Sequence, residues 1–340
     1  MTQSRLHASA LLIAFASSGI AHADNSSAAI ERLKRVTAAT SLEDITTRPW
    51  HAKLAVTLFD ADGKNPVEAT IDYWQSGKDS RRIIVVGADI DTKLRSEGKT
   101  YSGTTGLGVT STATDVFDSF IQPAPTLLEI DQSRPESRRQ TFGKTPLDCV
   151  ILSDPHAHIT QIPFGLYPTF CLDTTADRLL ASFAGNVQMS INQTSRFLDH
   201  DVSMAFTLVE GKAVLATAKV LELTTFVPAV DSFAPGPELK SGVERMAKIS
   251  SGVMARLKLS GPAPTYPDSA RKSHMDGTVI LDVIIGRDGH VHRLQVVSTP
   301  DADLGMSALS AVSHWIYKPY LLNGEAIELD TTVAVSFNLR

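Results

Sequence analysis

Apolar and polar positions alternate along most of the region from residue 46 to residue 224, which predicts antiparallel strands. Residues 50–59 show the pattern most clearly, with Trp50, Leu54 and Leu58 on one face and Lys53 and Thr57 on the other. Successive side chains of a strand point to opposite faces, so this spacing predicts a strand with one buried face. The other strands predicted in this way cover residues 67–74, 81–86, 179–184, 187–192, 202–209 and 213–223.

Turn signals such as Asp60-Ala-Asp-Gly63 and Gly185-Asn186 separate these segments. The best helix candidate covers residues 115–121 and is ended by Pro123 and Pro125. Many short strands joined by tight turns predict an antiparallel, curved β-sheet domain. A curved sheet can enclose an apolar groove, and the region loosely resembles periplasmic carriers of the LolA type. A plain sheet with a filled core is the alternative.

The last eighty residues carry a second set of strand and turn signals. Residues 277–285 alternate, with Val279, Leu281 and Val283 on one face. Asp288-Gly289 favours a hairpin turn into a return strand at residues 290–297. Residues 328–339 alternate again and predict a closing strand.

Between these strands the spacing predicts a short helix ending at Trp315. Asp301 and Asp303 offer N-cap oxygens. The apolar face of this helix contains Leu304, Ala308, Ala311, Val312 and Trp315, which makes Trp315 an expected core residue. The fold class predicted for the whole chain is therefore α+β, with the curved antiparallel sheet followed by a small β-β-α-β domain.

The C-terminal region resembles the C-terminal domain of TonB-family proteins across residues 262–340. The matching motifs are Tyr266-Pro267, Gly277-x-Val279, Asp288-Gly289-x-Val291, Ala311-Val312-x-x-Trp315 and Phe337. The resemblance implies that the last strand receives a short peptide of an outer-membrane transporter by strand addition, with main-chain hydrogen bonds providing the affinity. The partner-binding residues it implies are Thr332, Ala334, Ser336 and Asn338 on the outward side, together with Tyr266 and Pro267.

The N-terminus predicts export. Residues 1–23 combine Arg5, an uncharged apolar stretch and the site Ala21-His22-Ala23, as in a cleaved signal peptide. An uncleaved membrane anchor is the rival interpretation, but the apolar run is short for a spanning helix. Cleavage would leave no anchor for the energy coupling that TonB transducers perform. The expected location is the periplasm.

The predicted organisation continues with a lead segment at residues 24–45, the β domain at 46–224, a proline-containing linker at 225–248 and the TonB-like domain at 249–340. Residues 238–248 are expected to form a short helix. Residues 249–259 fit helical and alternating spacings alike.

The two cysteines, Cys149 and Cys171, lie in strand-like segments. An even pair in an exported chain favours a disulfide, and two buried thiols are the alternative. The charge is balanced, with 32 basic and 37 acidic residues and no basic run, so nucleic acid is not an expected partner.

Candidate chemistry is sparse in this sequence. His156 and His158, and likewise His290 and His292, stand two residues apart, but without a third ligand at a recognisable spacing the prediction is no metal. We find no enzyme motif and expect no cofactor. The leading hypothesis is a non-enzymatic protein that binds an outer-membrane transporter or another envelope protein. The alternatives are a carrier of an apolar or lipid ligand and a structural protein that forms homodimers.

Overall fold

The computed structural model describes residues 26–106, 110–156, 159, 162–242, 246–322 and 325–339. The signal-peptide segment and His158 lie outside the described residues. Among the described helices, none has the length and apolar character that a membrane span requires.

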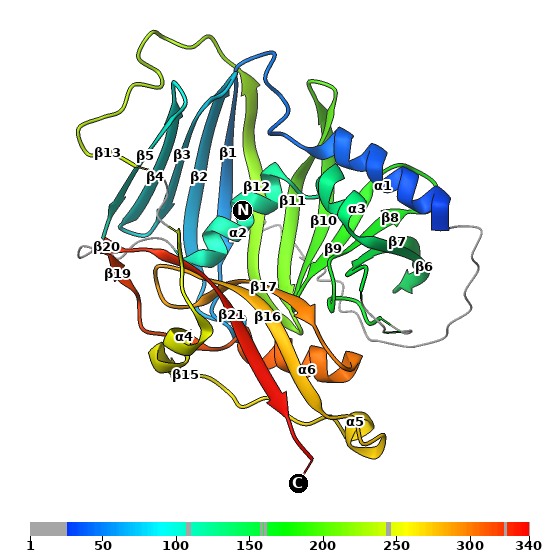
Figure 1. Cartoon of the computed structure of the whole chain (residues 1–340). Helices are drawn as coiled ribbons and strands as arrows, with labels where there is room; N and C mark the ends of the chain where they lie inside the picture. The colour runs from blue at the N-terminus through cyan, green and yellow to red at the C-terminus, as the bar shows by residue number, and fades with distance from the viewer. Residues whose placement is uncertain are drawn as a thin grey trace, which may run out of the picture.

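A thirteen-stranded antiparallel sheet forms the larger part of the molecule (Figure 1). One half is a meander of β1 (Trp50–Leu58), β2 (Val67–Ser76), β3 (Asp79–Val86), β4 (Asp89–Ser96) and β5 (Lys99–Thr105). The other half runs through β6 (Arg134–Phe142), β7 (Thr145–Ser153), β8 (Thr169–Asp173), β9 (Leu179–Ala184), β10 (Val187–Phe197), β11 (His200–Glu210) and β12 (Ala213–Thr225). Pairing of β1 with β12 joins the two halves, and β13 (Lys240–Ser241) pairs with β5.

The alternation in the sequence is confirmed by the burial of β1. Every second residue from Trp50 to Leu58 is buried, and the residues between them are partly exposed. In β2, Ala69, Ile71 and Tyr73 are buried as expected. Val67, the first residue of β2, is 45% exposed and departs from this pattern.

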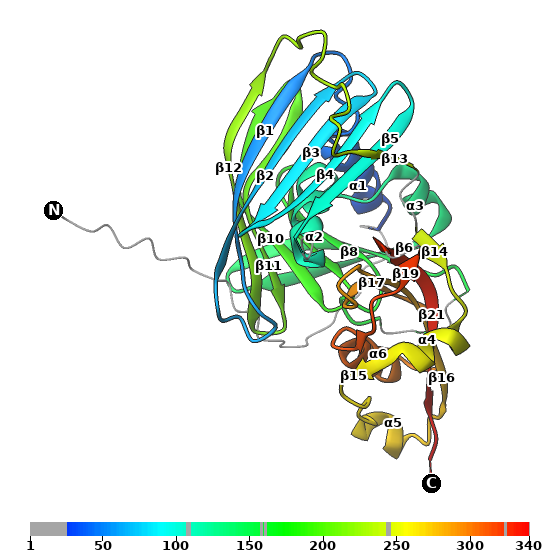
Figure 2. The same cartoon turned by 90° about the vertical axis from the view of Figure 1, so that its left-hand side faces the viewer.

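The sheet is curved and open, and three helices cover one of its faces, which we term the inner face (Figure 2). They are α1 (Ser26–Thr40), α2 (Ser111–Ile121) and α3 (Leu127–Gln132). On α2, Val116 and Phe120 are buried in one cluster with the core residues of β1 and β11. The sequence predicts α2 but not α1, which lies in the lead segment 24–45 and buries Leu33 and Val36.

The C-terminal unit contains a second sheet in the order β14-β21-β16-β17. Its elements are β14 (Met246–Lys248), α4 (Ser251–Leu257), β15 (Lys258–Ser260), α5 (Asp268–Lys272), β16 (Gly277–Ile285), β17 (Val291–Ser298), α6 (Ala302–Val312), β18 (Ile316–Tyr317), β19 (Leu321–Leu322), β20 (Glu325–Ala326) and β21 (Glu328–Phe337). The β-β-α-β order is therefore confirmed. Asp301 caps α6, accepting hydrogen bonds from the backbone of Asp303 and Leu304.

Two local predictions are wrong. The expected helix at 238–248 is replaced by β13 and β14, because backbone groups there pair with β5 and β21. Trp315 does not lie on the helix, since α6 ends at Val312. Its ring is partly buried, and its indole nitrogen donates to the carbonyl of Pro262 at 2.8 Å.

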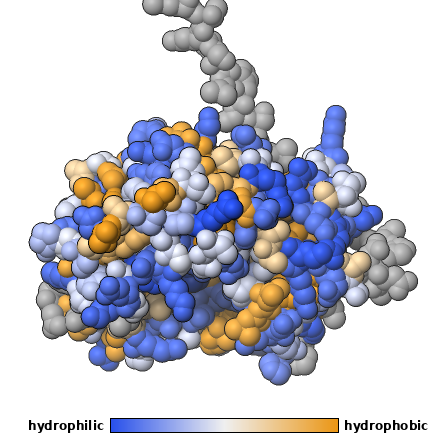
Figure 3. Space-filling view, turned by 90° about the horizontal axis from the view of Figure 1, so that it is seen from above, coloured by the Kyte–Doolittle hydropathy of each residue, from blue (hydrophilic) through white to orange (hydrophobic). Residues whose placement is uncertain are grey.

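The C-terminal unit and the large sheet share one apolar cluster, which includes Ile151, Phe183, Leu281 and Leu309. Strand β7 is buried on both faces, because Val150 packs with α1 whereas Cys149 and Ile151 belong to the shared cluster. Seen from above, polar residues cover much of the surface, and the apolar ones form small separate groups (Figure 3).

Candidate functional site

Strand β21 is the central feature of the C-terminal unit. It pairs along its full length with β16, antiparallel and without a bulge, from Leu329 opposite Ile285 to Phe337 opposite Gly277. On its other side it pairs only at its start, where β14 runs parallel to Glu328–Asp330. The strand is therefore held firmly along one edge and by a short segment along the other.

The hydrogen bonds of Asp330 show which residues face which edge. Its carbonyl accepts from the backbone N–H of Ile249 at 3.0 Å, on the β14 side. Because the N–H and C=O of successive residues in a strand point alternately to the two sides, Thr332, Ala334 and Ser336 present their backbone groups to the same outer edge. Val333 and Val335 present theirs to β16.

Beyond Asp330, no strand in the described part of the chain pairs with this outer edge. Helix α4 packs beside the first part of β21. The backbone groups of Ala334 and Ser336 lie further along and form an open edge, which can template an added strand. Figure 1 shows this part of β21 at the rim of the molecule, next to the C-terminus.

The side chains of β21 follow the predicted alternation. Val333, Val335 and Phe337 are buried against the shared apolar cluster. Thr332, Ala334, Ser336 and Asn338 are exposed, and the Ser336 hydroxyl lies 3.1 Å from that of Thr278 on β16. The structure thus brings these four predicted residues together on one surface.

Tyr266 and Pro267 lie at the far end of the same strand. The ring of Tyr266 meets that of Phe337 edge-on, with centroids 5.6 Å apart. The Tyr266 hydroxyl donates to the carbonyl of Met275 at 2.5 Å, and Pro267 precedes the first residue of α5. Tyr266 therefore braces the end of β21 and is itself only partly exposed.

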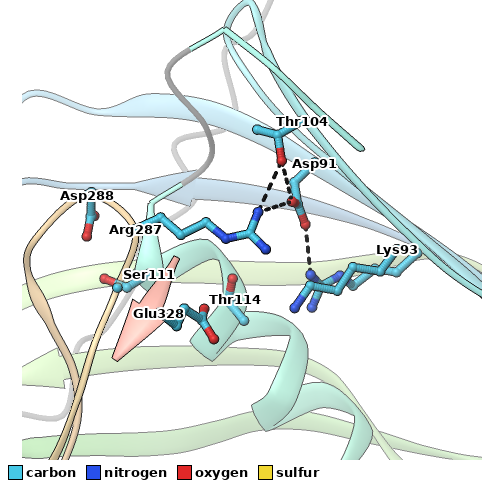
Figure 4. A pocket seen from close by; sticks show the side chains of 10 residues that line it. Asp91, Lys93, Thr104, Ser111, Thr114, Arg287, Asp288 and Glu328 are labelled. Carbon is cyan, nitrogen blue, oxygen red and sulfur yellow. Dashed lines mark hydrogen bonds and ion pairs between the residues drawn. The ribbon is translucent and has the colours of Figure 1, made fainter. Parts of the chain in front are cut away.

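Ion pairs and hydrogen bonds fix the C-terminal unit against the large sheet. Arg287 extends from the hairpin after β16 to Asp91 at 3.7 Å and to the hydroxyl of Thr104 at 3.2 Å (Figure 4). On the other side of the contact, the amide of Asn186 donates to the hydroxyl of Ser313 at 3.1 Å. These contacts hold the hairpin and α6 and leave the outer edge of β21 free of them.

A second group of contacts joins β17 to α2. His292 is buried, with its Nδ1 3.2 Å from Asp115, and Arg293 approaches Asp118 at 3.5 Å. Burial lowers the pKa of His292, but the Asp115 carboxylate outweighs this and raises it overall. Burial also raises the pKa of Asp118, and the neighbouring Asp115 raises it further.

The paired histidines do not converge on a metal site. His290 lies next to Asp288, whereas His292 turns to Asp115. Among the described residues, no group of three or more His, Cys, Asp or Glu side chains is arranged to hold a metal ion.

Cys149 and Cys171 form a disulfide across the paired strands β7 and β8, as predicted. Both sulfur-bearing residues are fully buried in the shared cluster. The bond stabilises the part of the large sheet on which the C-terminal unit rests.

Comparisons with known proteins agree with the resemblance seen in the C-terminal region. Residues 262–339 match the family model described as Gram-negative bacterial TonB protein C-terminal. Over 77 residues the chain is 30% identical to Protein TonB of Vibrio cholerae serotype O1, a match that covers 22% of this chain and 32% of that protein. The matched part thus spans about a third of the length of this curated relative.

Two solved structures resemble the larger part of the molecule. A DUF1329 family protein from Desulfovibrio piger matches 61% of this chain and 96% of its own, at 8% identity and a TM-score of 0.40. A LolA superfamily protein from Nitrosomonas europaea matches 62% of this chain and 97% of its own, at 9% identity and a TM-score of 0.31.

Proposed function

We propose that this protein binds an extended segment of an outer-membrane transporter, or of another envelope protein, by adding it as a strand to the outer edge of β21. The observation that carries the proposal is the set of outward backbone groups of Thr332, Ala334 and Ser336, which follow the short β14 pairing. The match to the TonB C-terminal model supports the kind of partner.

The side chains on this edge support recognition through the backbone. Ala334 and Ser336 are small and uncharged. Their side chains therefore neither block nor repel an incoming strand. Main-chain hydrogen bonds would provide most of the affinity, and alternate side chains of the partner would provide the selectivity. We propose no catalytic role for this edge.

The carrier alternative requires an apolar cavity on the inner face of the large sheet. A cavity of about 390 Å³ that the described residues form there is lined mainly by charged and polar side chains, among them Arg82, Arg95 and Asp118. No specific observation favours an apolar ligand there, so we prefer the binding function.

The test is a binding titration with a fluorescent peptide from a periplasm-facing segment of an outer-membrane transporter. Ala334→Pro removes one outward N–H and places a ring on the edge, so we expect roughly tenfold weaker binding, or about 1.4 kcal/mol. Ala334→Ser keeps the backbone donor and should bind as the parent does. Equal binding by a folded Ala334→Pro variant would refute strand addition at this edge.

The proposed location is the periplasm, which follows from the predicted signal peptide at residues 1–23. Intact-mass analysis of protein recovered from the periplasm should find Asp24 as its first residue. A membrane-bound form that begins at Met1 would instead favour the anchored alternative. Sedimentation of the purified protein at several concentrations tests the homodimer, which would compete with the peptide for the same edge.

A further inference from the structure

A short piece of the linker already occupies one end of the edge that the proposed function uses. Strand β14 pairs in parallel with Glu328–Asp330, and the backbone N–H of Ile249 donates to the carbonyl of Asp330 at 3.0 Å. The hydroxyl of Thr331 donates to the carbonyl of Ile249 at 2.7 Å. Residues 246–249, which we call the strap, therefore cover the outer edge of β21 as far as Thr331.

The strap shortens the part of β21 that a partner strand can reach. Outward backbone groups alternate along the strand, so Glu328 and Asp330 belong to the same row as Thr332, Ala334 and Ser336. In the described part of the chain, the last three of these residues are free of strand pairing on this side. If the strap left, a partner could pair with the whole row.

The side-chain contacts that hold the strap are weak. Met246 is 49% exposed, and Lys248 forms an ion pair with Asp330 at 3.6 Å in which the lysine side chain is 84% exposed. An ion pair this exposed contributes little to stability. Ala247 and Ile249 pack against the shared apolar cluster but are only partly buried. Backbone pairing thus provides much of the attachment, and a partner strand can provide the same kind of hydrogen bonds.

The segment after the strap gives it room to move. Ser250, Ser251 and Gly252 are all exposed, and a Cβ placed on Gly252 would meet no neighbouring segment of the described structure within 4 Å. Glycine and serine leave the backbone flexible. Helix α4 is nevertheless fixed, because Met254 is 1% exposed and belongs to the shared apolar cluster. The strap can therefore leave β21 while α4 stays in place.

We propose that the strap is a displaceable cover of the partner-binding edge. An incoming strand that extends past Thr331 exchanges with the strap and takes over its hydrogen bonds to Glu328 and Asp330. The inference rests on the proposed function, because it concerns the same edge. The exchange breaks and forms hydrogen bonds of the same kind, so its net cost is small.

The exchange also sets a requirement on the partner strand. Ile249 packs against the shared apolar cluster, so the partner residue that replaces it must be apolar as well. When no partner is bound, the strap reduces the length of unpaired edge, which would otherwise template unwanted strands.

A strap that cannot leave provides the main test. Lys248→Cys combined with Asp330→Cys places cysteines at register partners on neighbouring strands, which lie about 4.8 Å apart, within the range of a disulfide. The native disulfide is fully buried, so a mild reductant opens the engineered bond first.

The probe is a fluorescent peptide from a periplasm-facing segment of an outer-membrane transporter, as long as the 10 residues of β21. We expect the oxidised double variant to bind this peptide about tenfold more weakly than its own reduced form, because the hydrogen bonds at Glu328 and Asp330 stay with the strap. The reduced form should bind within about threefold of the parent.

A variant with a weaker strap should show the opposite effect. Lys248→Glu replaces the ion pair with two like charges beside Asp330 and should tighten peptide binding about threefold. Lys212→Glu is the matched control, because it makes the same change of charge in the exposed turn between β11 and β12. It should bind as the parent does. Saturating peptide should also accelerate hydrogen exchange at the backbone amides of residues 246–249 in the parent.

Failure of the displacement and failure of the proposed function give different results. Equal affinity of the oxidised and reduced forms, or unchanged exchange at residues 246–249, would mean that the partner binds beside a fixed strap, and strand addition would still hold. Equally tight binding by Lys248→Glu and Lys212→Glu would show a general effect of charge and would also overturn the displacement. No binding of the peptide by the parent would refute strand addition itself, and the displacement with it.

Discussion

The two larger sheets of the described structure each present an edge, and the two edges differ in character. Strand β6, at one end of the large sheet, carries Arg134, Arg138 and Arg139, and its second residue is Pro135. Charged side chains and proline on an edge strand block pairing with other chains. Helix α1 also packs against β6. This edge is built to end the sheet.

The outer edge of β21 lacks these protective features. Thr332, Ala334 and Ser336 are uncharged, and no proline lies between Glu328 and Phe337. Arginines and a helix thus cover the edge at β6, whereas the outer edge of β21 is open beyond Asp330. The difference is consistent with the proposal that the open edge of β21 receives a partner strand, whereas the edge at β6 is closed to pairing.

The largest effect should come from proline on the paired side of β21. Val335 presents its N–H to β16 and its side chain to the core. Val335→Pro would leave a buried acceptor unpaired and disrupt packing, so we expect a loss of more than about 3 kcal/mol in the free energy of unfolding. Urea denaturation of the purified variant measures it.

Ala334→Pro is the matched control for this prediction, one residue away on the same strand. Its N–H faces the open edge, so the expected loss of stability is below about 1 kcal/mol. If both prolines destabilised the protein equally, the assignment of the two sides of β21 would be wrong.

The protected end of the large sheet should depend on its disulfide. Cys171→Ser removes the bond between β7 and β8 and should cost about 2–4 kcal/mol, because the bond restricts the unfolded chain. The measurement is urea denaturation of the variant and of the parent, with and without a reductant. A reductant that left the parent unchanged would show that the bond contributes nothing to stability.

A smaller effect is expected at Trp315, because it lies beyond the end of α6. Trp315→Ala should cost about 1–3 kcal/mol, below the value for a buried tryptophan, since its ring is partly exposed. Trp315→Phe keeps the packing but removes the hydrogen bond to Pro262, and about 1 kcal/mol should be lost. Thermal denaturation distinguishes the two. If Trp315→Ala lowered the free energy of unfolding by about 3–5 kcal/mol, Trp315 would be a core residue, as the sequence predicts.

The strands with clean alternation could be predicted from the sequence, and the polar ones could not. Strands β1, β2 and β16 have one apolar face, whereas β4 carries the charged residues Asp91, Lys93 and Arg95 on one face. Period-two hydrophobicity cannot detect such a strand. Lys93 and Arg95 line the cavity on the inner face of the sheet. The same charged residues that line this cavity prevent β4 from being predicted as a strand.

The candidate edge of β21 was predictable because alternation fixes which side chains face outward. The edge to which the backbone N–H and C=O of Ala334 point could not be predicted. It is revealed by the hydrogen bond between Asp330 and Ile249, which lie in distant segments of the chain. The same limit explains the wrong helical assignment at residues 238–248. Residues 240–241 and 246–248 pair with strands that are far away in sequence, and tertiary pairing overrides local propensity.

The smallest effect concerns the contact between β17 and α2, which holds the C-terminal unit while its far edge stays open. The pKa of His292 is raised in the folded protein, against burial, by Asp115. A raised histidine pKa adds stability that is complete below about pH 6.5 and is lost as the pH rises through the folded value. The contribution of His292 to stability should therefore decrease as the pH rises above about 6.5.

His292→Gln should flatten this decrease, because glutamine does not titrate. The raised pKa of His290, beside Asp288, acts in the same direction, so the parent's slope has more than one source. His290→Gln is the matched variant at a more exposed position and should change the slope less. Urea denaturation at several pH values measures both. An unchanged slope in His292→Gln would mean that the contact between β17 and α2 does not depend on the charge of this histidine.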